Sequence, residues 1–185
     1  MQTTFVVHVE DRPGVLNRVA SLVRRRGFNI ESVTVGRTDV EGISRMTLVV
    51  DADEAARPRL QAHLYKLVHV RRVNDVTDVP AVTRDLALIK VSADPSSRAE
   101  IMQLVDVFRA RVVDVAPESL VIEITGTEDK VDGLLDMLRP YGILETARTG
   151  RVTMARGAAT RQVNGRPVRQ TLTTAAGEDG VACSV

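Results

Sequence analysis

Apolar and polar positions alternate with two different periods along the first half of the chain. Runs of β-branched and apolar residues bounded by turn residues predict strands, and apolar residues three to four positions apart predict amphipathic helices. The strands are expected at 3–9, 30–35, 44–50 and 68–73, and the helices at 15–27 and 56–67. The predicted order of the first half is therefore βαββαβ.

The same order returns in the second half of the chain, after a linker that contains Pro80. The stretch ALIKV at 87–91 is similar to FVVHV at 5–9, and the apolar pattern then predicts the remaining elements. Strands are expected at 112–115, 120–125 and 143–147, and helices over 97–108 and 131–138. Ser97 and Glu100 are placed to form a capping box at the first of these helices. We interpret the chain as an internal duplication.

Each repeat has the order of a split βαβ, or ferredoxin-like, sandwich, in which two helices cover one face of an antiparallel sheet. The predicted fold class is therefore α+β, with two tandem βαββαβ units. The predicted boundaries are 1–76 for the first unit, 77–84 for a linker, 85–155 for the second unit and 156–185 for a tail. The tail has no apolar period and is predicted to be disordered. The uncovered sheet faces and edges favour pairing between protomers or between the two units.

Composition narrows the functional classes. Of 185 residues, 44% are hydrophobic, and 25 Lys and Arg nearly balance 24 Asp and Glu, so net charge indicates neither a nucleic-acid nor a membrane partner. No apolar run approaches the roughly 18 residues of a membrane span, and no signal peptide is evident, so a cytoplasmic location is expected. A single cysteine, Cys183, and three histidines without ligand spacing disfavour disulfides and metal sites.

The stretch EDRPGVLNRV at 10–19 lies where the first predicted strand is followed by the first helix. Pro13 suits a first turn and Asp11 is placed to help cap the helix, so the turn has a purely structural explanation. Gly14 is harder to explain, because glycine in a first turn destabilises a helix unless the bare backbone has a use. One use is access of a carboxylate or phosphate to free N–H groups. Asn29 adds a donor and an acceptor, and both a ligand site and a plain turn fit these residues.

Three longer motifs follow one another in the first unit: ED-x-PGVL-x-RV, RRGFNIES-x-TVG and SRMT, with LALIKV opening the second unit. In these motifs the chain resembles the small, regulatory subunits of acetohydroxyacid synthase, also called acetolactate synthase, whose first unit is an ACT domain. The resemblance covers residues 2–155. It implies a non-catalytic subunit that binds and activates a large catalytic subunit. It also implies allosteric feedback inhibition of branched-chain amino-acid biosynthesis by valine, or by leucine or isoleucine.

The resemblance further implies that the effector lies between the ACT domains of a homodimer. Asp11 and Gly14 would lie at the helix start of one protomer, and Asn29 would come from the facing protomer. The implied effector-binding residues are Asp11, Pro13, Gly14, Val15, Leu16, Asn29 and Ile30. Thiamine diphosphate, FAD and Mg²⁺ are implied only for the catalytic subunit, and no cofactor or metal is expected in this chain.

The second unit differs from the first at the positions that correspond to the implied effector site. Its corresponding turn, VSADPSSRAEI, has no glycine at the helix start, and RARVVDV stands in place of the Asn-Ile step. We therefore expect no effector site there, only dimerisation or contact with the catalytic subunit.

Other functions are compatible with the predicted fold. Autonomous catalysis is disfavoured, because the serines have no evident histidine partner. A nucleic-acid-binding module would stack bases on exposed aromatic residues, but aromatics are 3% of the chain and only Phe5 lies on a predicted central strand. Arg24 and Arg25 suit the end of a helix, although they could also contact the catalytic subunit. A stand-alone ACT sensor for a different enzyme remains an alternative.

Overall fold

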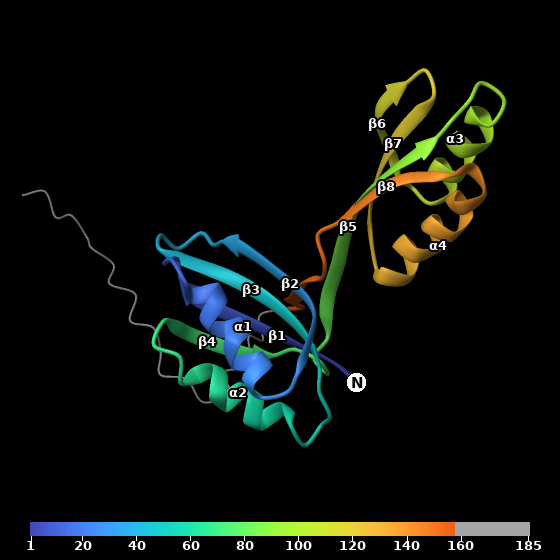
Figure 1. Ribbon diagram of the computed structural model, residues 1–185. Coiled ribbons are helices and arrows are strands. Elements are labelled where there is room, and N and C mark those ends of the chain that lie inside the picture. The colour runs from blue at the N-terminus through green and yellow to red at the C-terminus, as the bar shows by residue number, and fades with distance from the viewer. Residues whose placement is uncertain (158–185) are drawn as a thin grey trace, which may run out of the picture.

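The computed structural model describes residues 1–157, which form two α+β units joined by one long strand (Figure 1). The first unit has an antiparallel sheet of order β2-β3-β1-β4, and both of its helices cover one face. Its elements are β1 (Gln2–Glu10), α1 (Val15–Arg25), β2 (Asn29–Arg37), β3 (Ile43–Asp51), α2 (Arg57–Tyr65) and β4 (Val70–Asp75).

The second unit repeats this arrangement with a sheet of order β6-β7-β5-β8. Its elements are β5 (Ala81–Ser92), α3 (Arg98–Val107), β6 (Arg111–Ala116), β7 (Ser119–Gly126), α4 (Glu128–Leu138), the 3-10 helix η1 (Arg139–Tyr141) and β8 (Ile143–Arg148). Both units therefore have the βαββαβ order, and the predicted α+β class is confirmed.

Alternating burial along the strands builds one apolar core in each unit. On β1, Phe5, Val7 and Val9 face the helices, where they pack against Val19 and Val23 of α1. Phe5 is completely buried, so its ring cannot stack on a nucleobase. The second core is built in the same way from β5, β7, α3 and α4.

Two features of the junction differ from the sequence prediction. β5 begins at Ala81, so the last four residues of the predicted linker, 81–84, belong to a strand. They pair with an additional strand, β9 (Val152–Ala155), that the apolar pattern did not predict. β9 is short, and Val152 and Met154 are exposed, so it lacks the buried apolar alternation by which strands are recognised. The predicted tail lies outside the described residues from 158 onward.

Among residues 1–157, no helix has the length and apolar character needed to cross a membrane.

Candidate functional site

Gly14 is the N-cap of α1 and has φ 82°, in the left-handed region that favours glycine. The backbone conformation by itself therefore explains why this residue is glycine. The prediction that Asp11 caps the helix is wrong, because no side chain caps α1. Asp11 instead forms an ion pair with Arg37 at 3.4 Å, which draws its carboxylate toward the end of β2.

The first turn of α1 offers unused hydrogen-bond donors. The backbone N–H groups of Leu16 and Asn17 have no acceptor among residues 1–157. A Cβ added at Gly14 would meet no atom within 4 Å, so the space in front of the turn is open. Free N–H groups and the positive end of the helix dipole favour a negatively charged ligand group at this position.

The other predicted residues of this loop divide into exposed and buried ones. Pro13 is exposed and the Leu16 side chain is 47% exposed, so both are accessible to a ligand or a second copy. Val15 is buried in the core, and Ile30 is partly buried against it. Val15 and Ile30 therefore position the neighbouring backbone, while Leu16 presents a free apolar surface.

Asn29 is exposed at the start of β2, immediately beyond the C-terminal end of α1. Since α1 has 11 residues, its two ends are about 16 Å apart at 1.5 Å per residue. One copy of the chain therefore does not bring Asn29 to the Gly14 turn. A site that contains both residues requires a second copy.

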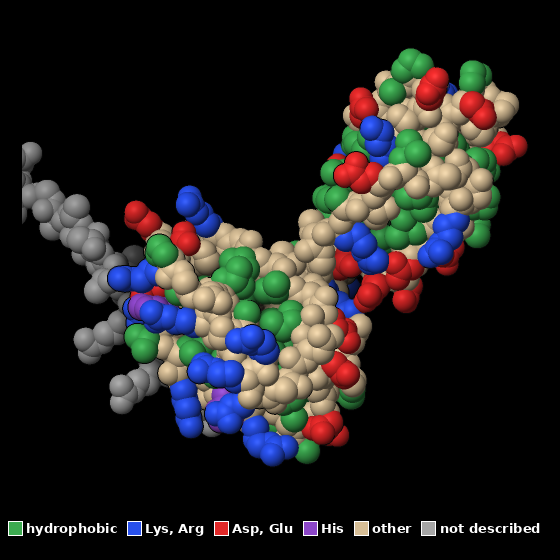
Figure 2. Space-filling view, viewed as in Figure 1, with side chains coloured by type: hydrophobic (Ala, Val, Ile, Leu, Met, Phe, Trp, Pro, Cys, Tyr) green, Lys and Arg blue, Asp and Glu red, His purple; other side chains and the backbone are tan. Residues whose placement is uncertain are grey.

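β2 is an edge strand suited to such a second copy. Within the described chain its outer edge has no strand partner. Val33 and Val35 on β2 are 39% and 45% exposed, because α1 does not reach over the edge of the sheet. Figure 2 shows apolar side chains exposed on this part of the first unit. An unpaired edge flanked by exposed apolar side chains is typical of a strand-to-strand interface.

The matching helix start in the second unit already holds a carboxylate. Asp94 Oδ1 accepts hydrogen bonds from the backbone N–H groups of Ser96 and Ser97, at 2.9 and 2.8 Å. The Ser96 hydroxyl donates to the same oxygen at 2.6 Å, and with the other hydrogen bonds it lowers the pKa of Asp94 to about 2. The predicted capping box is wrong, because Ser97 makes no capping bond and Glu100 accepts from the Tyr141 hydroxyl.

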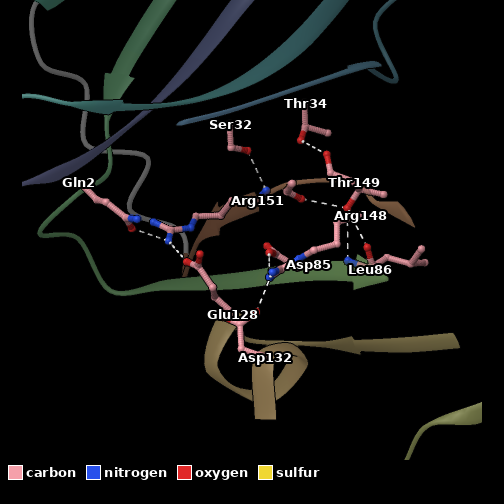
Figure 3. A network of polar contacts seen from close by, with 11 residues as sticks. Gln2, Ser32, Thr34, Asp85, Leu86, Glu128, Asp132, Arg148, Thr149 and Arg151 are labelled. Atoms are coloured by element: carbon pink, nitrogen blue, oxygen red, sulfur yellow. Dashed lines mark hydrogen bonds and ion pairs between the residues drawn. The ribbon is translucent and has the colours of Figure 1, made fainter. Parts of the chain in front are cut away.

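A polar network joins the two units, and its centre is Arg151 (Figure 3). The Arg151 guanidinium donates to Gln2 Oε1 of β1 at 2.7 Å and to Glu128 Oε2 of α4 at 2.6 Å. The backbone N–H of Arg151 donates to Ser32 Oγ of β2 at 3.1 Å. One residue thus contacts two strands of the first unit and a helix of the second.

Next to Arg151, two residues bring the backbone of the junction close to β2. The Thr34 hydroxyl donates to the Thr149 carbonyl at 3.1 Å. Gly150 has φ 81°, and a Cβ added there would lie 2.4 Å from Ser32 Oγ. A side chain at position 150 would therefore push β2 away from the junction.

The two units also enclose a polar cleft of about 380 Å³ beside this network. On its second-unit side, Arg148 donates to Asp132 at 2.7 Å and to the buried Asp85 at 3.1 Å. None of these contacts was predicted from the sequence, because no motif marks Arg148 or Arg151. The Gly-Arg step at 150–151 is the one local signal of a close backbone approach.

Two ferredoxin-like units, the first with an open helix start beside a free edge strand, define an ACT-domain protein. Residues 5–72 match the family described as AHAS small subunit-like ACT domain, and residues 84–157 match the family described as small subunit of acetolactate synthase. The chain belongs to the acetolactate synthase small-subunit family.

Relatives support this assignment over most of the chain. The probable acetolactate synthase small subunit of Archaeoglobus fulgidus is 51% identical over 157 residues, which cover 85% of this chain and 98% of the relative. The acetolactate synthase small subunit of Mycobacterium bovis is 49% identical over 83% of this chain and 92% of its own length. The crystal structure of the acetolactate synthase small subunit from Thermotoga maritima superposes with a TM-score of 0.81, at 40% identity, over 85% and 98% of the two chains.

Proposed function

We propose that this chain is a non-catalytic regulatory subunit that activates the catalytic subunit of acetolactate synthase and makes it sensitive to valine or another branched-chain amino acid. It acts in the cytoplasm, together with the large subunit that binds thiamine diphosphate, FAD and Mg²⁺. The observation that carries the proposal is the open first turn of α1 in a chain of this family, with unpaired N–H groups at Leu16 and Asn17.

The effector binds between the first units of two copies in a homodimer. Its carboxylate accepts hydrogen bonds from the first turn of α1, and its apolar side chain lies near the exposed Leu16. Asn29 of the second copy supplies the remaining polar contacts, consistent with its position at the far end of α1 in its own copy. Pairing along β2 covers Val33 and Val35.

The effector's influence reaches the second unit through β2. Asn29 begins this strand, and Ser32 and Thr34 of the same strand hydrogen bond the junction at Arg151 and Thr149. A shift of β2 on effector binding therefore changes the contacts that hold the second unit. Allosteric coupling is reciprocal. If the effector disfavours the activated arrangement of the complex by some factor, that arrangement lowers the affinity for the effector by the same factor.

Two measurements on the purified chain test the proposal. Added to the catalytic subunit, the chain is expected to raise the rate of acetolactate formation, and L-valine is expected to reverse the increase. Calorimetric titration with L-valine, L-leucine and L-isoleucine identifies the preferred effector. A chain that neither raises the rate nor binds any of the three amino acids would contradict the proposal.

A further inference from the structure

Three nitrogen-containing side chains lie side by side across the first sheet. His8 on β1 is directly opposite Arg45 on β3 and directly opposite Arg72 on β4. Because Val7 and Val9 point into the core, His8 and its two partners point to the opposite face, which no helix covers. We call Arg45, His8 and Arg72 the cationic row, and all three side chains are half-buried.

The two arginines of the row contact only neutral groups among residues 1–157. Arg45 donates to Thr47 Oγ1 at 3.4 Å and to the backbone carbonyl of Thr153. Arg72 donates through Nε to Asn74 Oδ1 at 3.1 Å. Neither arginine forms an ion pair with a described carboxylate, and both lie opposite the same histidine.

The nearest carboxylate on the same face of β1 is already engaged. Glu10 pairs with Arg12 at 3.0 Å, with His69 at 2.9 Å and with Arg71. Three partners therefore compete for its two oxygens, so Glu10 does not neutralise the cationic row.

The row also contains two buried nitrogen atoms with no hydrogen-bond partner among residues 1–157. These atoms are His8 Nδ1 and Arg72 Nη2. Burial, together with the charges of Arg45 and Arg72, lowers the pKa of His8. Two half-buried cations without a carboxylate partner, and a buried guanidinium N–H group without an acceptor, both destabilise the isolated fold. An anionic partner that accepts hydrogen bonds from these arginines would offset this loss of stability.

We propose that the cationic row is the docking site for an acidic surface segment of the catalytic subunit. Arginine presents a planar set of donors that binds a carboxylate through two parallel hydrogen bonds. Arg45 and Arg72 lie on the two strands that flank β1, so the carboxylates of one extended acidic segment reach both. The proposal rests on the proposed function, because it assigns the contact that brings the catalytic subunit to this chain.

Arg24 and Arg25, at the end of α1, provide a natural comparison. Both are exposed in the last helical turn, where positive charge suits the helix dipole, and Arg25 Nε donates to the Ser21 carbonyl at 3.3 Å. These two arginines are stabilised within their own helix. The cationic row lacks such stabilisation, so we expect it to contribute more to docking.

Matched double variants of the full chain test the proposal. Arg45→Gln with Arg72→Gln, and Arg24→Gln with Arg25→Gln, remove the same charge from two different surfaces. The dissociation constant of each variant for the catalytic subunit is measured at low and high salt, and thermal unfolding checks that both variants are folded. The row variant is expected to bind at least roughly tenfold more weakly, with a smaller salt dependence, while the helix variant stays close to wild type.

Each other result overturns the docking site in a recognisable way. If the folded row variant binds as tightly as wild type, or only the helix variant is weakened, docking does not use the row. If the chain binds inorganic phosphate in calorimetry, and the row variant loses this binding but not the catalytic subunit, the row is a small-anion site. If the wild-type chain does not bind the catalytic subunit at all, the proposed function fails as well.

Discussion

The two units share one fold but begin their first helices in opposite ways. In the second unit, Asp94 gives its carboxylate to the N–H groups of Ser96 and Ser97. In the first unit, no carboxylate binds the loop before α1, the donors at Leu16 and Asn17 have no acceptor among residues 1–157, and Gly14 leaves the approach open. The second helix therefore has an internal carboxylate where the first has room for an external one.

Under the proposed function, this difference explains why only the first unit binds the effector. A carboxylate of the chain itself, held in the loop before a helix, stabilises that loop and repels an incoming anion. A helix start without such a carboxylate lacks this stabilisation, and a bound anionic ligand stabilises the folded chain instead. The account can be tested by changing either helix start.

The largest effect is expected from Gly14→Asp. Aspartate tolerates the left-handed backbone better than most residues, so the variant should fold. Its carboxylate occupies the open turn and repels the carboxylate of the effector. Loss of two hydrogen bonds to a charged group weakens L-valine binding by about 3 kcal/mol, or roughly a hundredfold, as calorimetry will show. Inhibition by L-valine should disappear while activation of the catalytic subunit persists, and unchanged inhibition would exclude this site.

The next largest effect is expected from Arg151→Ala, which cuts the connection between the two units. The variant loses the side-chain contacts to Gln2 of β1 and Glu128 of α4, so α4 is no longer tied to the first sheet through this residue, while the backbone hydrogen bond to Ser32 remains. L-valine should still bind the isolated chain with wild-type affinity. Maximal inhibition of the holoenzyme should fall, because the coupling free energy between the effector site and the catalytic subunit, about 1 to 3 kcal/mol, is reduced. Arg139→Ala, which removes an exposed ion pair with Asp136, is the control and should keep full inhibition.

A smaller, local effect is expected from Asp94→Asn. Hydrogen bonds hold the pKa of Asp94 at about 2, below its ordinary 3.8. Because the folded-state pKa is lowered, this contribution to stability is complete above pH 3.8 and is lost as the pH falls through about 2. Hydrogen exchange of α3 should become faster in the variant at neutral pH and lose its wild-type dependence on pH in that window. Exchange of α1 should not change, and a change there would show that the two helix starts are coupled.

The smallest effect is expected from Ser97→Gly, which places glycine where the second unit matches Gly14. The Asp94 carboxylate still holds the Ser96 amide and the amide of residue 97, so no effector site should appear. Chemical denaturation should change the free energy of unfolding by only a few tenths of a kcal/mol. A new L-valine site in the second unit would show that glycine is sufficient even with the Asp94 carboxylate in place.

The sequence predicted the fold well because apolar periodicity is set by burial. Every predicted strand and helix of the two units exists, since residues such as Phe5 and Val23 must face the core for the sheet to form. The capping predictions for Asp11 and Ser97 were wrong, because several polar residues compete near each helix start. Asp11 pairs with Arg37, and Asp94 accepts the hydrogen bond from the Ser97 N–H group that the Glu100 side chain was expected to accept.

The candidate site could be predicted only in part. Its residues come from local motifs and their division between two copies from the family resemblance, and the length of α1, which places Asn29 far from Gly14, is compatible with that division. The junction at Arg151 could not be predicted, because its contacts join segments more than a hundred residues apart, such as Ser32 and Arg151. The cationic row depends on the register of three strands, which no single segment of the sequence specifies.

The most direct test of the account is a mixing experiment between two variants that each lack L-valine binding, Gly14→Asp and Asn29→Ala. If one site takes Gly14 from one copy and Asn29 from the other, a mixed dimer contains one intact site. Refolding the two variants together should then restore binding at roughly a quarter of the sites, measured by calorimetry, as expected for random pairing in a symmetric dimer. If the mixture forms mixed dimers but binds no L-valine, the effector site is not shared between two copies and the account is wrong.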